Sequence, residues 1–242
     1  MKAMIFAAGL GTRLRPLTDT CPKALIPIGE KPLLQIVIEH LKKHGVTEAV
    51  VNIHYLGELV KAFLKEHNNF GIRIEISDES EQLLETGGGL WKAKDFFDNG
   101  RPFVVGNADV LTNIHIGEFY QSHLKKNPLA TLAVRKRKSS RLLLFDEKEN
   151  LCGWKNANTG EVKMPRKSEV IHEFAFSGYH VISPEIFNYP TRQGVFSMTD
   201  WYLDICASHT IALFDHSEDL WIDIGSRENL EEARKRSNEL ND

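Results

Sequence analysis

Residues 7–23 read Ala-Ala-Gly-Leu-Gly-Thr-Arg-Leu-Arg-Pro-Leu-Thr-Asp-Thr-Cys-Pro-Lys and directly follow a short apolar run at 3–6. The apolar run predicts a buried strand, and the segment after it predicts a glycine-rich turn. Glycines 9 and 11 permit positive φ values and let backbone N–H groups approach a ligand closely. Arg13 and Lys23 add positive charge to the same turn. Bare backbone donors and cationic side chains after a first strand are typical of a polyphosphate site.

The turn differs from two common phosphate-binding motifs. A dinucleotide-binding turn needs a third glycine, and Leu14 stands at that position. Pro16 and Pro22 prevent a long helix from beginning inside the turn. The Walker pattern of Gly-x-x-x-x-Gly-Lys-Ser/Thr is also absent. These departures argue against a nicotinamide dehydrogenase and favour another way of binding phosphate.

Composition excludes several classes of partner. The 242 residues are 42% hydrophobic and 26% charged, with a net charge of −3, so no overall field favours nucleic acid. The basic run 135–141 lacks interleaved aromatic residues and predicts a solvated strand end or hairpin. Three cysteines without Cys-x-x-Cys spacing argue against a disulfide framework or a zinc site. No apolar stretch approaches a membrane span, and Met1 leads directly into the first strand. We therefore expect a cytoplasmic protein that binds neither nucleic acid nor membrane.

Hydrophobic periodicity predicts an alternation of strands and helices through the first half of the chain. The expected strands are 1–6, 49–53, 72–76, 103–105 and 130–134, and the expected helices are 32–43, 56–66 (with Leu59 facing inward), 89–97 and 116–126. After residue 142 the pattern predicts an antiparallel insertion to 162, a strand at 175–182, a helix at 198–209, a strand at 211–214 and a closing helix at 226–236 capped by Ser226. This order predicts an α/β fold with a doubly wound, mostly parallel, Rossmann-like mixed sheet and a small antiparallel β insertion.

Several further segments, taken in chain order, carry a family resemblance. They are Gly9–Thr18 with Pro22–Ile28, Leu84–Leu90 (Leu-Glu-Thr-Gly-Gly-Gly-Leu), Gly106–Asp109, Phe176–Tyr179 and Trp221–Gly225. In this order the chain resembles the sugar-1-phosphate nucleotidyltransferases, and it looks most like the short N-acetylmuramate 1-phosphate uridylyltransferases of cell-wall recycling. The resemblance implies one domain over 1–242, with a nucleotide-binding part at 1–135 and a sugar-binding part with the closing helix at 136–242.

The resemblance implies an enzyme that joins a nucleoside triphosphate to a sugar 1-phosphate and releases pyrophosphate, with Mg²⁺ as cofactor. The attacking phosphate is already an anion, so positioning and electrostatics should dominate catalysis. Arg13 is expected to bind the β- and γ-phosphates through its guanidinium group, which can donate two parallel hydrogen bonds. Lys23 is expected to bind the α-phosphate or the sugar phosphate. The nucleotide-binding residues are expected to be Ala8, Gly9, Gly11, Thr12, Arg13, Gln82, Glu85, Thr86, Gly87, Gly88 and Asn107.

Two aspartates are candidate metal ligands. Asp109 follows a central strand, at the sheet edge where open α/β folds bind ligands, and its hard oxygens suit Mg²⁺. The resemblance implies that Asp223 converges on the same ion. An Asx turn or a helix cap is the alternative for each.

The remaining expectations concern the base and the sugar. Three successive glycines at 87–89 are costly for a simple turn and predict a loop against which a flat base lies. The resemblance implies sugar contacts from Glu173, Ser177 and Gly178. Many relatives carry a Glu-Lys-Pro segment before this strand; the chain has none, so Arg166 or Lys167 are the candidates to replace that lysine.

Within the family that the chain resembles, an Ala-Ala-Gly opening is more typical of uridylyl and cytidylyl transfer, and an Ala-Gly-Gly opening of thymidylyl and guanylyl transfer, so the resemblance implies uridylyl transfer first. The alternatives are guanylyl transfer to mannose or heptose 1-phosphate, thymidylyl transfer to glucose 1-phosphate, cytidylyl transfer to phosphocholine, and a non-catalytic nucleotide-sugar sensor. The partners expected are the triphosphate and the sugar phosphate, in a monomer or small homo-oligomer.

Overall fold

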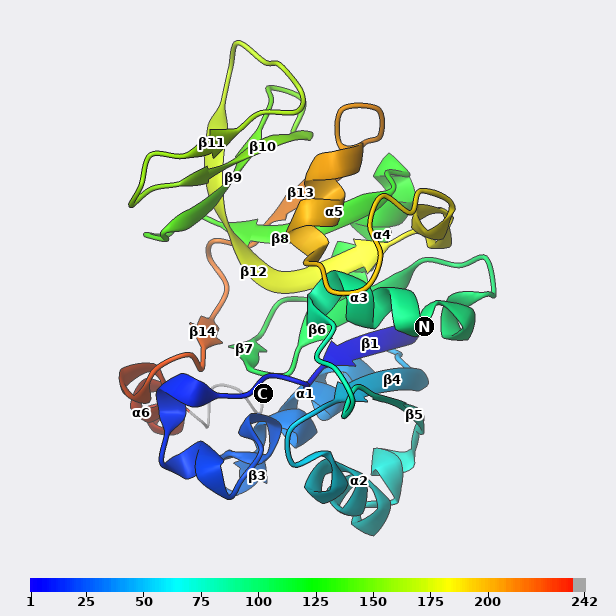
Figure 1. Ribbon diagram of the computed structural model, residues 1–242, viewed down its shortest axis with the longest axis vertical. Helices are drawn as coiled ribbons and strands as arrows, with labels where there is room; N and C mark the ends of the chain where they lie inside the picture. Colours follow the sequence, from blue (N-terminus) through cyan, green and yellow to red (C-terminus); the bar gives the residue numbers. More distant parts are fainter. Residues whose placement is uncertain (237–242) are drawn as a thin grey trace. The chain divides into compact units, whose positions relative to one another are not determined.

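The computed structural model describes residues 1–236 (Figure 1). Its contacts divide the chain into two compact units. The first unit contains 1–83, 105–116 and the segment from Asp219 onward, and the second contains 84–104 and 117–218.

The first unit contains a parallel sheet. Its strands and helices alternate as β1 (Lys2–Phe6), α1 (Leu33–Lys43), β4 (Glu48–Ile53), α2 (Gly57–Glu66) and β5 (Arg73–Asp78). Met4 pairs with Val50, and Val50 pairs with Glu75. The end of β6 (Phe103–Asn107) lies on the other side of β1, which gives the order β5-β4-β1-β6. The predicted Rossmann-like alternation is confirmed in this unit.

Small elements complete the first unit. They are β2 (Pro27–Ile28), β3 (Lys31–Pro32), β7 (Val110–Thr112), β14 (Trp221–Asp223), α6 (Arg227–Lys235) and the 3₁₀ turns η1 (Thr12–Leu14), η2 (Leu17–Asp19), η3 (Lys23–Leu25) and η4 (Asn68–Gly71). Ser226 caps α6 as predicted, because its side chain accepts a hydrogen bond from the Asn229 N–H at 3.2 Å. A buried cluster that includes Leu14, Ile224 and Leu230 joins η1, the end of β14 and α6. Since apolar burial drives folding, this cluster fixes the glycine-rich turn to elements from the far end of the chain.

The second unit is mixed. Its strands are β8 (Ala130–Arg135), β9 (Arg141–Phe145), β10 (Leu151–Asn156), β11 (Val162–Lys163), β12 (His172–Ile182) and β13 (Ile211–Asp215). Strands β11-β10-β9-β12 are antiparallel neighbours, β12 also pairs with β8, and β8 pairs with β13 in parallel. Its helices are α3 (Glu85–Lys92), α4 (Ile116–Lys126) and α5 (Met198–Ile205), with 3₁₀ turns η5 (Lys94–Phe97) and η6 (Pro184–Asn188). The antiparallel insertion predicted after residue 142 is confirmed.

Three local predictions are wrong. The helix expected from Gly89 begins at Glu85, so the glycine run lies inside α3 rather than in a loop. The helix expected to run to His209 ends at Ile205 and continues only as a turn. Leu59, expected to face inward, is 44% exposed.

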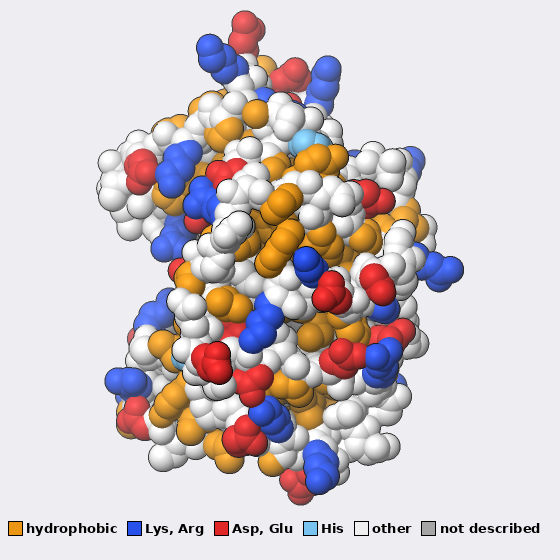
Figure 2. Space-filling model, turned by 45° about the vertical axis from the view of Figure 1, so that its right-hand side comes forward, with side chains coloured by type: hydrophobic (Ala, Val, Ile, Leu, Met, Phe, Trp, Pro, Cys, Tyr) orange, Lys and Arg blue, Asp and Glu red, His pale blue; other side chains and the backbone are white. Residues whose placement is uncertain are grey.

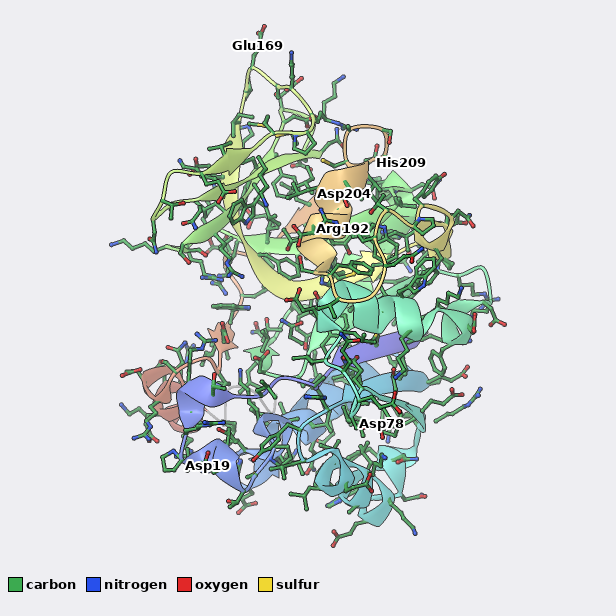
Figure 3. The ribbon with its side chains drawn as sticks, viewed as in Figure 1. Asp19, Asp78, Glu169, Arg192, Asp204 and His209 are labelled. Atoms are coloured by element: carbon green, nitrogen blue, oxygen red, sulfur yellow. The ribbon has the colours of Figure 1, made fainter. Side chains whose placement is uncertain are left out.

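Charged side chains of both signs are interspersed over the face seen in Figure 2, in agreement with the small net charge. In Figure 3, Arg192 and Asp204 lie together: the guanidinium donates to both carboxylate oxygens, at 2.5 and 2.9 Å, and holds the pKa of Asp204 below its usual range.

All three cysteines are free, and burial raises the pKa of Cys152 and Cys206 to about 11. Within residues 1–236, no helix has the length and apolar character needed to cross a bilayer.

Candidate functional site

The strand order of the first unit changes direction at β1. The chain runs from β1 to β4 and β5 on one side, and β6 lies on the other side, so β1 and β6 flank a topological switch point. The Ala108 N–H donates to the Phe6 carbonyl at 3.0 Å, which brings the two strand ends together. Ligands of open α/β sheets bind at the carboxyl ends of strands at such a point. The glycine-rich turn after β1 and Asp109 after β6 both lie there.

The glycine-rich turn folds as short 3₁₀ turns, and its two glycines have different reasons to be glycine. Gly11 has a φ of +62°, and a Cβ there would lie 2.7 Å from Cγ2 of Thr18. The Thr18 hydroxyl also donates to the Gly11 carbonyl at 2.9 Å. A Cβ on Gly9 would meet no atom within 4 Å among the described residues. The fold therefore requires Gly11, whereas it leaves open space at Gly9.

Lys23 and Asp109 form an ion pair. The Lys23 ammonium donates to Oδ2 of Asp109, and the lysine side chain is only 10% exposed. Pro22 precedes η3 with an extended backbone and sets the direction of Lys23. The predicted phosphate-binding lysine and the predicted metal ligand are thus brought into direct contact.

Arg13 lies against the backbone of Gly225. A Cβ on Gly225 would lie 2.9 Å from a terminal guanidinium nitrogen of Arg13. Neither an ion pair nor a hydrogen bond joins the Arg13 guanidinium to any residue in the described part of the chain. Arg15 instead pairs with Asp19 at 3.3 Å, and its carbonyl accepts a hydrogen bond from Arg227 of α6. Of the two arginines in the turn, Arg13 is the one whose guanidinium group is available to bind a ligand.

The backbones of the two candidate metal ligands are adjacent. Asp223 pairs with Val110 in the antiparallel β14–β7 ladder, and the Ile224 N–H donates to the Asp109 carbonyl at 2.9 Å. In residues 1–236, no group of three or more His, Cys, Asp or Glu side chains could hold a metal ion. Mg²⁺ commonly takes one or two carboxylates and completes its shell with substrate phosphates and water. Two aspartates beside a turn that is predicted to bind phosphate are consistent with such a site.

The structure reveals two residues that the sequence reasoning missed. Asn52 at the end of β4 accepts a hydrogen bond from the Ala7 N–H at 2.7 Å and donates to Oε1 of Glu79 at 2.8 Å. Both side chains are buried, with exposures of 3% and 1%. The Glu79 backbone is fixed in turn by the Ile53 carbonyl and by a ring nitrogen of His54. This pair holds the first amide of the glycine-rich turn.

In the second unit, the glycine run has a packing role. A Cβ on Gly87 would lie 2.4 Å from the Phe196 ring, and one on Gly88 would lie 2.2 Å from the Gly194 carbonyl oxygen. The N–H groups of both glycines also donate to the Phe196 carbonyl. The glycines let the 194–196 segment lie directly on α3. This contact gives Gly87 and Gly88 a packing role that the sequence analysis did not anticipate.

Glu85 and Thr86 begin the same helix. Glu85 has a φ of +59°, an uncommon conformation for a residue with a side chain and one that often marks a functional segment. The Thr86 hydroxyl accepts a hydrogen bond from the Met198 N–H at 2.9 Å. Thr86 therefore fixes the start of α5 to α3.

The three expected sugar-binding residues lie on β12. Gly178 has a φ of +87° within an irregularity of the β12–β8 ladder between Phe176 and His180. Ser177 is fully buried, and Glu173 pairs with Lys155 of β10 at 2.7 Å. Arg166, a candidate for the missing lysine, instead donates to the His209 carbonyl and lies 4.0 Å from Asp146.

The expected site residues are thus distributed over the two units. The first unit holds Ala8, Gly9, Gly11, Thr12, Arg13, Lys23, Gln82, Asn107, Asp109 and Asp223, and the second holds Glu85, Thr86, Gly87, Gly88, Glu173, Ser177 and Gly178. The Gln82 N–H donates to the Glu79 carbonyl, beside the pair that holds the turn. The structure brings together Lys23 with Asp109, and Arg13 with Gly225.

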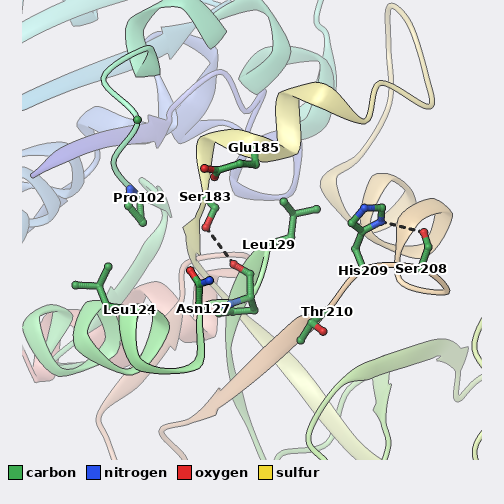
Figure 4. A pocket seen from close by; sticks show the side chains of 11 residues that line it. Pro102, Leu124, Asn127, Leu129, Ser183, Glu185, Ser208, His209 and Thr210 are labelled. Carbon is green, nitrogen blue, oxygen red and sulfur yellow. Dashed lines mark hydrogen bonds between the residues drawn. The ribbon is translucent and has the colours of Figure 1, made fainter.

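Figure 4 shows a cavity of about 500 Å³ in the second unit that contains none of these residues. Its wall includes Glu185, Ser183 and His209, and the Ser183 hydroxyl donates to the Pro128 carbonyl at 3.0 Å. Glu185 is its one acidic group, and no lysine or arginine lines it among the described residues. It lacks the positive charge that a phosphorylated ligand requires.

Comparisons with known proteins agree with the features of the turn. A family model described as nucleotidyl transferase matches residues 2–142. An N-acetylmuramate alpha-1-phosphate uridylyltransferase of Caulobacter vibrioides is 34% identical over 92% of this chain and 91% of its own length. A UTP–glucose-1-phosphate uridylyltransferase of Synechocystis sp. is 28% identical over 93% of this chain, which spans 60% of that protein. The crystal structure of HddC from Yersinia pseudotuberculosis complexed with GMP-PN superposes with a TM-score of 0.78 at 22% identity and covers 98% of this chain and 99% of that one.

Proposed function

This chain belongs to the nucleotidyl transferase family, and on that premise we propose that it joins a sugar 1-phosphate to a nucleoside triphosphate, with release of pyrophosphate. UTP and N-acetylmuramate 1-phosphate are the substrates we favour. The similarity to the Caulobacter protein supports this choice because it extends over nearly the whole of both chains.

One arrangement carries this function: an available Arg13 fork beside the Lys23–Asp109 pair at the switch point. A polyphosphate needs fixed cations and backbone donors, and the turn supplies both. A sensor of nucleotide sugars would not need a paired lysine and carboxylate beside the phosphates.

The reaction forms a bond between a phosphate oxygen of the sugar phosphate and the α-phosphorus of the triphosphate. The bond from the α-phosphorus to the bridging oxygen breaks, and pyrophosphate leaves with its electron pair. Because the attacking oxygen is already anionic, no side chain has to remove a proton. Arg13 binds the departing β- and γ-phosphates, while Lys23 neutralises charge that develops at the α-phosphorus.

Asp109 and Asp223 would hold Mg²⁺, which when bound neutralises phosphate charge as a Lewis acid. Their contribution is to fix hard oxygen ligands beside the turn. Asn52 and Glu79 keep the Ala7 amide in place, so that the following amides of the turn face the phosphates.

We assign the base to Gln82, Glu85, Thr86 and the backbone of Gly87 and Gly88, with Ala8, Thr12 and Asn107 completing the nucleotide contacts. We assign the sugar to Glu173, Ser177 and Gly178. The strained backbone at Glu85 supports a functional role for that segment, and the irregular strand at Gly178 leaves room for a pyranose.

A pyrophosphate-release assay tests this function. Purified protein with Mg²⁺ is offered four nucleoside triphosphates against a panel of sugar 1-phosphates and phosphocholine. Turnover confined to UTP with an amino-sugar phosphate is the expected result. Turnover with GTP, dTTP or CTP would support the proposed reaction and show that the proposed nucleotide is wrong. Nucleotide binding without turnover on the whole panel would identify a sensor.

A further inference from the structure

A second cavity, of about 220 Å³, lies in the β9–β10–β12 region of the second unit. Its wall includes Arg137, Ser140, Arg141, Trp154, Phe176 and Thr199. Phe176 precedes Ser177 and Gly178, so the cavity adjoins the strand to which we assign the sugar. None of the functional assignments above uses the two arginines.

The strand register places the cavity on one face of the antiparallel sheet. Leu143, which also lines the cavity, pairs with Trp154 on one side and with Phe174 on the other. Arg141 and Phe176 lie two residues from members of this row, and alternate residues of a strand share a face. Lys155 and Glu173, which form an ion pair, occupy the alternate strand positions and so face the other side of the sheet. Glu173 therefore does not neutralise the arginines of the cavity.

The charge of the cavity is positive. Two guanidinium groups line it, and no aspartate or glutamate does so in the described chain. Arg137 is fixed, because it donates to the carbonyls of Phe176 and Lys138 at 3.2 and 3.3 Å. The Arg141 guanidinium has neither a hydrogen bond nor an ion pair within residues 1–236.

The backbone of Arg141 is nevertheless well defined. The Ser139 hydroxyl accepts a hydrogen bond from the Arg141 N–H at 3.2 Å and donates to the Arg141 carbonyl at 2.9 Å. An arginine whose backbone is held in place and whose guanidinium group has no partner within the described residues suits bidentate recognition of a carboxylate. Trp154 and Phe176 supply the apolar walls expected of a small-molecule site with few polar groups.

We propose that this cavity binds a carboxylate that the sugar carries in addition to its 1-phosphate, and that Arg141 thereby selects acidic sugar phosphates. This rests on the proposed nucleotidyl transfer. Arg141 recognises the substituent that distinguishes one sugar from another.

The test compares two substrates that differ only by a lactyl ether: N-acetylmuramate 1-phosphate and N-acetylglucosamine 1-phosphate. The ratio of their kcat/KM values is measured for the wild type, Arg141→Ala and Arg141→Lys, with Lys138→Ala as a control from the same exposed basic run. Removing one charge-assisted hydrogen-bond pair should lower the ratio by about tenfold to a hundredfold in Arg141→Ala. Arg141→Lys should fall between, and Lys138→Ala should retain the wild-type ratio. An equal loss on both substrates would overturn the proposal, because the arginine would then serve the shared phosphate.

A binding measurement tests this proposal independently of the proposed reaction. Calorimetry measures the affinity of the wild type and Arg141→Ala for N-acetylmuramate and for its methyl ester, which is one methyl group larger and carries no charge. A preference for the acid that disappears in Arg141→Ala supports the site even if no triphosphate is turned over. Equal affinity for acid and ester overturns it even if the enzyme is active.

Discussion

The ammonium group of Lys23 donates a hydrogen bond to a carboxylate oxygen of Asp109, a residue 86 positions further along the chain. The pair joins the turn after β1 to the turn after β6, where it fixes a cation and an anion side by side. The lysine side chain is 10% exposed and the aspartate side chain 30% exposed, so the contact is only partly screened by water. Each member can therefore be tested both for stability and for catalysis.

Asp109→Asn keeps the shape of the side chain and removes its charge. We expect kcat/KM to fall by about 10²–10³, the usual effect of losing one preorganised electrostatic contact. Initial rates are measured across a Mg²⁺ titration, with exposed Asp95→Asn as a control for lost charge. Normal rates at the same Mg²⁺ concentration would remove Asp109 from the metal site.

Lys23→Met removes the cation and leaves the Asp109 carboxylate partly buried without this partner. We expect the free energy of unfolding to fall by about 1–2 kcal/mol, less than for a fully buried pair because Asp109 is partly solvated. The double variant Lys23→Met/Asp109→Asn should recover much of that loss in urea unfolding, while kcat/KM stays low. Recovery of activity together with stability would show that the pair is only structural.

Gly9→Ala and Gly88→Ala should distinguish a glycine that leaves room for a ligand from a glycine that is required for packing. The new Cβ at Gly9 meets no described atom, so we expect an unchanged melting temperature and at least tenfold weaker UTP binding. The Cβ at Gly88 would overlap a backbone oxygen and should cost about 1–3 kcal/mol of stability. Thermal unfolding and UTP titration of both variants check this contrast; a stable Gly88→Ala protein would contradict the contact with the 194–196 segment.

Asn52→Ala should loosen the glycine-rich turn. The variant removes the acceptor of the Ala7 N–H and one donor to Oε1 of Glu79, at a cost of about 1–3 kcal/mol. Because we assign the triphosphate to this turn, KM for the nucleotide should rise more than KM for the sugar phosphate. Exposed Asn99→Ala serves as the control. Equal effects on both KM values would show that Asn52 supports the fold alone.

Acidification should destabilise the protein through buried neutral histidines. Burial lowers the pKa of His123 to about 4 and that of His180 to about 3, from 6.5. The unfolded chain therefore binds more protons below pH 6.5, so stability is complete above that pH and is lost as the pH falls toward about 4. Each histidine contributes a slope of up to about 1.4 kcal/mol per pH unit. Urea unfolding between pH 7 and 4.5 measures the slope, which His123→Asn should reduce and exposed His172→Asn should not.

Local sequence signals predicted the parts of the site that depend on neighbouring residues. The strand, the glycine-rich turn and Lys23 are contiguous, and Asp109 comes two residues after its own strand, so periodicity and spacing were sufficient to place these residues at strand ends. The Asn52–Glu79 pair was missed because it joins the ends of two strands, and no local pattern marks a buried amide that holds a distant backbone.

The glycine run shows a different limit. Its composition indicated that something approaches the backbone closely, and one such neighbour is the 194–196 segment, more than a hundred residues away. The basic run 135–141 was predicted to be a solvated strand end, and its lining of a cavity depends on the register of β9, β10 and β12. Sequence reasoning identified the unusual residues; their partners required the fold.

Arg227 of α6 donates to the Arg15 carbonyl across 212 positions of sequence, and Gly225 lies under the Arg13 guanidinium. The glycine-rich turn is translated well before its supports, which emerge only when the ribosome has passed the codon of Arg227. A nascent chain interrupted before that point would carry the signature residues of the turn without the contacts that hold Arg13 and Arg15. Premature termination would therefore yield a product that retains the residues of the turn and lacks the contacts that Gly225 and Arg227 make with it.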